Sequence, residues 1–169
     1  MPDAADERSS LDDPADAAAL ARYATTLADR IEQAIPGWID RLVRRVLVDQ
    51  DIAADDVVAA RIADAGRAAR IDGGRDVRAL LSSDIDAQAG NPLAVLRSLV
   101  PHATAVLDAA GARPVTRDEF SMRSFPDDVY DLTPASFADV DPALHEPGLV
   151  WGAAKAHVHL ARRRRQGKR

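Results

Sequence analysis

The sequence predicts an all-α fold, a single-domain multi-helix bundle of about five to six helices. Three observations lead to this expectation. Apolar residues recur at spacings of three and four along several stretches, as on one face of an α-helix. Alanine and arginine, both strong helix formers, are abundant. No stretch alternates apolar and polar residues for long enough to indicate a β-sheet.

The domain organisation follows from changes in composition along the chain. At 169 residues, the chain is long enough to bury one hydrophobic core. We expect a disordered acidic N-terminus over residues 1–13, a helical domain over 14–161 and a basic tail over 162–169. Within the helical domain, a long ordered strap rich in proline and aromatic residues should cover 112–147, followed by a final helix at 148–163.

The first two helices are expected on either side of a Pro-Gly pair. Asp13 and Pro14 suit the N-cap and the first position of a helix. Pro36 and Gly37 should end that helix, because both residues destabilise a helix interior. The second helix should then turn one apolar face inward, formed by Trp38, Ile39, Leu42, Val43, Val46 and Leu47.

Glycine and proline also divide the next part of the chain. A third helix should be capped at residues 54–56 and stopped by Gly73 and Gly74. A shorter fourth helix should end near Gly90. A fifth should begin at Pro92 and either kink or restart at Pro101. The predicted inward residues of the third and fifth helices are Val57, Val58, Ile62, Ala65, Ala69, Leu93, Leu96, Leu99, Val100, Ala103, Val106, Leu107 and Ala110.

The last third of the chain differs in composition from the helices before it. Five of the ten prolines and five of the seven aromatic residues lie after Arg113. Proline prevents a long helix here, whereas disordered chains are depleted in aromatic residues. We therefore expect the strap to be ordered and packed on the helices. Long ordered loops in compact domains are often functional.

The final helix is apolar on two opposite faces, with Lys155 as the one charged residue between residues 149 and 161. Such a helix requires cover from both sides, either from its own domain or from a partner. We therefore interpret the chain as a non-enzymatic protein that acts through protein–protein interaction or self-association, for example as a homodimer. Because interfaces are enriched in aromatic residues, the predicted interaction residues are Phe120, Phe125, Tyr130, Phe137, Leu149, Trp151 and Leu160.

An alternative interpretation is a small enzyme or ligand-binding protein with a pocket between the strap and the helices. Its candidate residues are three carboxylates, one lysine and two histidines: Asp127, Asp128, Asp131, Lys155, His157 and His159. We predict no catalytic residue, no cofactor and no metal site. The two histidines lie about 200° apart around a helix, so both rings cannot easily bind one ion.

The charge distribution bears on nucleic-acid binding. Residues 1–16 carry a net charge of −5, and the tail 162–169 carries +6. Because the net charge of the whole chain is −5, the body between these two segments carries −6. A dedicated nucleic-acid-binding domain usually has a basic face on the fold itself. We do not expect the domain to bind nucleic acid, and weak binding through the basic tail remains a further alternative.

The sequence also indicates the compartment. The chain has no cysteine, which excludes disulfides, thiolate metal sites and a cysteine nucleophile. Its N-terminus is acidic where a secretory signal would be basic. No apolar run approaches the ~20 residues that span a bilayer. We expect a cytoplasmic protein without membrane insertion.

Two segments carry a resemblance to other proteins. They are Ser-Phe-Pro-Asp-Asp-Val-Tyr at residues 124–130 and Pro-Gly-Leu-Val-Trp-Gly-Ala-Ala-Lys at residues 147–155. With them, the stretch from Asn91 to Arg165 resembles small helical proteins of high-GC actinobacteria. The resemblance implies a bacterial, cytoplasmic setting and brings no activity with it.

Overall fold

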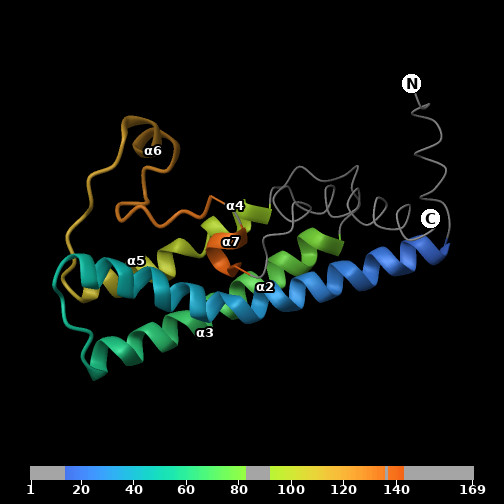
Figure 1. Cartoon of the computed structure of the whole chain (residues 1–169), viewed down its shortest axis with the longest axis horizontal. Helices are drawn as coiled ribbons and strands as arrows, with labels where there is room; N and C mark the ends of the chain where they lie inside the picture. Colours follow the sequence, from blue (N-terminus) through green and yellow to red (C-terminus); the bar gives the residue numbers. More distant parts are fainter. Residues whose placement is uncertain (1–13, 83–91, 136, 143–169) are drawn as a thin grey trace.

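The computed structural model describes residues 14–82, 92–135 and 137–142, and this part of the chain is helical without a β-strand, so the all-α prediction is confirmed. None of the helices described is long and apolar enough to cross a membrane. The helices, labelled as in Figure 1, are α2 (Pro14–Asp49), α3 (Asp56–Ser82), α4 (Pro92–Arg97), α5 (Val100–Ala109), α6 (Glu119–Ser124) and α7 (Phe137–Val140).

Two long helices, α2 and α3, form an antiparallel pair on which α4, α5 and α7 pack (Figure 1). A short connection at residues 50–55 reverses the chain between them. The inward face predicted for the second helix is confirmed, because all six of its apolar residues are buried. In α3 the prediction holds for Val58, Ile62 and Ala69, whereas Val57 is 59% exposed.

The predicted helix end at Pro36 and Gly37 is wrong, because α2 continues through both residues. An interior proline costs about 3 kcal/mol, since it removes a backbone hydrogen bond and crowds the preceding turn. Ile35 and Ile39 on either side are fully buried, and such a side chain contributes roughly 1.5–3 kcal/mol. Burial of the flanking turns therefore offsets the local cost, and the helix stays continuous.

The predicted stop at Gly73 and Gly74 is also wrong, because α3 continues to Ser82. A Cβ atom added to Gly73 would lie 2.5 Å from Leu99 Cδ1 and 3.0 Å from Ile35 Cδ1. One added to Gly74 would lie 2.8 Å from Glu32 Cγ. The two glycines let neighbouring elements approach α3 closely, and they do not end it.

Charged side chains join α2 and α3 beside these glycines. Arg78 of α3 contacts both Asp29 and Glu32 of α2, with 2.7 Å between Arg78 Nη2 and Asp29 Oδ1. Arg70 Nε lies 3.4 Å from Glu32 Oε1. The hydrogen bond from Arg78 holds the pKa of the Glu32 carboxyl below its usual value. The α2–α3 pair thus has a buried apolar seam with a charged edge.

The fifth predicted helix restarts as two pieces, one of the two alternatives that Pro101 allowed. Helix α4 ends at Arg97, and α5 begins at Val100 with Pro101 in its first turn. The backbone amide of Leu99 donates to the carbonyl of Leu96 at 3.1 Å, which closes the turn between the pieces. The predicted inward residues Leu96, Leu99, Val100, Ala103, Val106 and Leu107 are buried.

The described part of the strap packs on the helices. Tyr130, Leu132 and Val140 belong to the hydrophobic core, and α7 contacts α2. Arg41 of α2 donates a hydrogen bond to the carbonyl of Val140. Gln50 pairs with the backbone of residue 113 in both directions, at 2.6 and 2.7 Å. The final helix predicted at 148–163, the basic tail and residues 1–13 lie outside the described residues.

Gly73→Ala should lower the free energy of unfolding by up to about 2 kcal/mol, because an overpacking cost of roughly 1–3 kcal/mol against Leu99 and Ile35 outweighs the gain of about 1 kcal/mol in helix propensity. Gly37→Ala is the matched control. It is exposed, and its added Cβ would meet Arg41 Nη1 at an ordinary 3.5 Å. This variant should gain about 0.5–1 kcal/mol. Urea unfolding measures both changes, and a shift of the same sign in both variants would contradict the close packing at Gly73.

Candidate functional site

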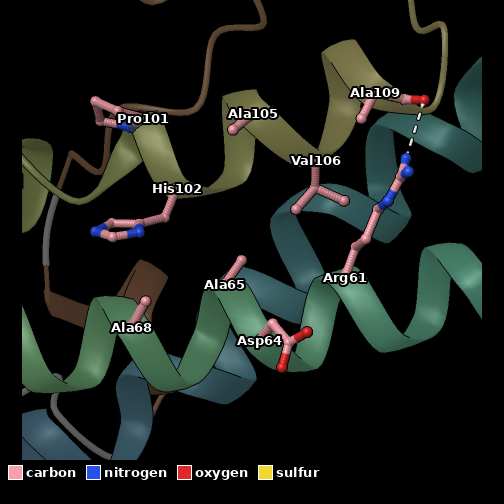
Figure 2. Close-up of a pocket in the computed structure, with 9 residues that line it drawn as sticks. All are labelled: Arg61, Asp64, Ala65, Ala68, Pro101, His102, Ala105, Val106 and Ala109. Carbon is pink, nitrogen blue, oxygen red and sulfur yellow. Dashed lines mark hydrogen bonds between the residues drawn. The ribbon is translucent and has the colours of Figure 1, made fainter.

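Two concave regions flank α5, and they share Pro101 and Ala105. The first, here called the α3/α5 groove, has a volume of about 560 Å³. Figure 2 shows alanine side chains from both helices facing each other across it, among them Ala65 and Ala68 from α3. Its lining is therefore mostly methyl groups.

The polar groups of the groove are engaged in contacts of their own. Arg61 Nη1 donates to the carbonyl of Ala109 at 3.3 Å, drawn as the dashed line in Figure 2. His102 Nε2 lies 3.2 Å from Asp72 Oδ2. Asp64 contacts Arg67 on its own helix. The groove consequently provides an apolar contact surface, and its charged groups are not directed at a common point.

The second concave region, the strap pocket, lies between α4/α5 and strap residues 124–133 and has a volume of about 530 Å³. Val100, Pro101 and Thr104 line it from the helices. Phe125 and Pro126 line it from the strap. The pocket exists because the strap leaves α5, projects away at α6 and returns to the helices (Figure 1).

Arg97 provides the positive charge of the strap pocket. Its Cζ atom lies 4.6 Å from the centre of the Phe125 ring, a distance at which a guanidinium is attracted to an aromatic face. Arg97 Nε and Thr104 Oγ1 are both buried, and neither has a hydrogen-bond partner in the part of the chain that the structure describes. Buried polar atoms usually have partners, so these two donors are the unexplained feature of the pocket.

The carboxylates of the pocket differ in what they do. Asp128 is 6% exposed and accepts hydrogen bonds from the amides of Leu132 and Thr133, and from Thr133 Oγ1 at 2.6 Å. It therefore shapes a turn of the strap. Asp108 accepts from the Tyr130 hydroxyl at 2.7 Å. Asp127 is exposed and forms no ion pair or hydrogen bond with another described residue.

The predicted interaction residues lie in different environments. Phe120 is 76% exposed on α6, and Phe125 is half-buried beside Arg97. Tyr130 is 3% exposed, so it contributes to the core and offers a partner no surface. Phe137 begins α7. The three remaining predicted residues, Leu149, Trp151 and Leu160, lie outside the described part of the chain.

The residues predicted for the alternative enzyme or ligand-binding pocket do not all line the same cavity. Asp127 and Asp128 line the strap pocket. Asp131 instead lines a separate cavity of about 780 Å³ beside α2, where its carbonyl accepts from Arg45 Nη2 at 3.3 Å. Lys155, His157 and His159 lie outside the described residues. Within residues 14–82, 92–135 and 137–142, no group of three or more His, Cys, Asp or Glu side chains is placed to hold a metal ion.

Sequence reasoning missed Arg97, Thr104 and Asp108, which line the strap pocket from the helices. Each is a polar residue within an amphipathic pattern, where the usual expectation is a solvent-facing side chain. The one sequence signal that could have indicated these residues is the helix restart at Pro101, because it interrupts the helix between Arg97 and Thr104.

The chain matches no protein family, no curated protein and no solved structure.

Burial raises the pKa of Tyr130 to about 12, and the hydrogen bond to Asp108 adds to the effect. Because the folded pKa exceeds the usual 10.0, the neutral phenol stabilises the fold fully below pH 10, and this contribution is lost between pH 10 and about 12. Tyr23→Phe leaves Tyr130 as the one tyrosine. Its phenolate absorbance should appear above pH 10 in the folded state and near pH 10 in urea. Coincident titrations would contradict a buried, hydrogen-bonded phenol.

Proposed function

We propose that this chain is a non-enzymatic helical protein that acts by binding another protein or a second copy of itself. The observation that carries the proposal is the exposure of two large apolar side chains on α6, which lie two residues apart and therefore on different sides of the helix. Phe120 is 76% exposed and Met122 is 48% exposed. In Figure 1, α6 stands apart from the α2–α3 pair. Aromatic residues and methionine are enriched at protein interfaces, and α6 has no buried residue, so a partner could contact it on the side of Phe120, on the side of Met122, or around both.

The local structure of α6 explains how it is held without a core of its own. None of its residues is buried. Asp118 caps the helix by accepting from the amide of Ser121 at 2.7 Å, and this hydrogen bond lowers the pKa of the Asp118 carboxyl. Arg117 Nη1 donates to the carbonyl of Phe125 at 2.6 Å. Hydrogen bonds at both ends thus maintain a short helix that presents apolar side chains outward.

The strap pocket favours binding over catalysis. Of its three carboxylates, Asp108 and Asp128 already accept hydrogen bonds that hold the strap in place. A general acid or base must be free to exchange a proton with a substrate. Two further parts of this proposal rest on the sequence alone. One is a bacterial, cytoplasmic setting, and the other is a contribution of residues 148–163 to the same interface.

The double variant Phe120→Ser/Met122→Ser tests the interface. We expect the wild-type chain to self-associate or to retain a specific protein partner, and the variant to bind at least about tenfold more weakly, because aromatic anchors dominate interface energies. Light scattering after size exclusion at several concentrations measures self-association, and titration with the captured partner measures hetero-association. Val48→Ser/Ile71→Ser is the matched control, since these side chains are 73% and 72% exposed on α2 and α3.

Two results would contradict the proposal. One is a wild-type chain that remains a monomer at every concentration and retains no protein specifically. The other is equal loss of binding in the control and in the α6 variant, because that result would show a general dependence on surface hydrophobicity.

A further inference from the structure

We propose that the strap pocket binds a small zwitterion with an apolar side chain, an amino acid or dipeptide, whose carboxylate pairs with Arg97 and whose ammonium group pairs with Asp127. This site goes beyond the proposed protein interface. It uses pocket residues of α4, α5 and the strap, whereas that interface rests on the exposed side chains of α6.

Arg97 has the geometry of an oxyanion-binding group. Its guanidinium lies against the face of the Phe125 ring, with Cζ 4.6 Å from the ring centre. A guanidinium held over an aromatic ring keeps its N–H donors in the plane, where they can pair with both oxygens of a carboxylate. Arg97 forms no ion pair or hydrogen bond with any other described residue. Because Nε itself is buried, a ligand carboxylate would pair with the two terminal nitrogens of the guanidinium.

Asp127 provides the complementary charge. Asp127 and Arg97 line the same pocket without forming an ion pair with each other. With Asp108 and Asp128, the pocket holds three carboxylates against one guanidinium. This excess of negative charge disfavours the binding of a ligand that carries only a negative charge, such as a fatty acid. A ligand that carries both a carboxylate and an ammonium group satisfies the two unpaired charges together.

The remaining walls define the rest of the ligand. Val100, Pro101, Ala105 and Pro126 are apolar, so they suit an aliphatic side chain. Thr104 also lines the pocket, and its hydroxyl oxygen is buried without a partner among the described residues. The volume of about 530 Å³ falls in the range of small-molecule sites. The hydrogen bonds of Asp128 hold the strap wall in place, and a preformed wall lowers the entropic cost of binding.

Isothermal titration calorimetry with leucine and leucyl-leucine tests the site in the full chain. We expect at least one of the two to bind saturably. N-acetyl-leucine lacks the ammonium group and leucinamide lacks the carboxylate, and the corresponding derivatives apply to the dipeptide. Each derivative should bind at least about tenfold more weakly, because a charge-assisted hydrogen bond is lost. Absence of saturable binding by both zwitterions up to about 10 mM, or equal binding of the derivatives, would overturn the proposal.

Variants locate the site. Asp127→Asn and Arg97→Gln should each weaken binding at least about tenfold. Asp64→Asn and Arg61→Gln, which change the neighbouring α3/α5 groove, should bind as the wild-type chain does. If Arg97→Gln unfolds, the exposed Asp127→Asn decides alone. Wild-type affinity in Asp127→Asn would refute the assigned pairing. Phe120→Ser/Met122→Ser should keep the ligand, so that loss of the protein interface and loss of this site are distinguished.

Discussion

The close approach of α2 and α3 is the constraint on which the rest of the structure depends. A Cβ at Gly66 would lie 3.2 Å from Pro36 Cα, so the two backbones meet at the centre of α2. Further along α3, Gly73 leaves the space that Leu99 and Ile35 occupy. Leu99 stands at the turn between α4 and α5, and α5 packs on both long helices. The position of α5 therefore depends on the absence of a side chain in α3.

The strap pocket depends on α5 in turn. Tyr130 joins the strap to α5 through Asp108, and Arg41 joins it to α2 through the carbonyl of Val140. Between the two ends of the strap, α6 has no buried residue and is held by its own caps. Packing thus fixes where the strap leaves and returns, and it leaves α6 and the pocket walls available for contact with other molecules. Both proposed activities use this same division between anchored and exposed strap residues.

The helical class and the inward faces could be predicted from the sequence, because period 3.6 directly reports which side chains are buried, as for Trp38 and Leu107. Helix ends could not be predicted, because tertiary packing rather than local helix propensity determines the backbone conformation at Pro36 and Gly73. Tyr130 was interpreted as an interface aromatic, yet composition cannot distinguish a core ring from an exposed one. The pairing of Arg97 with Phe125 joins residues 28 positions apart and leaves no local signature.

A double-mutant cycle between Gly73→Ala and Leu99→Ala tests the close packing of α3 most directly. The methyl added at residue 73 should fit into the space vacated by Leu99, so the double variant should be more stable than the sum of the single changes predicts. We expect an interaction energy of about 1 kcal/mol or more, measured by urea unfolding. Additivity within about 0.5 kcal/mol would contradict the account, because the two residues would then not share the same space.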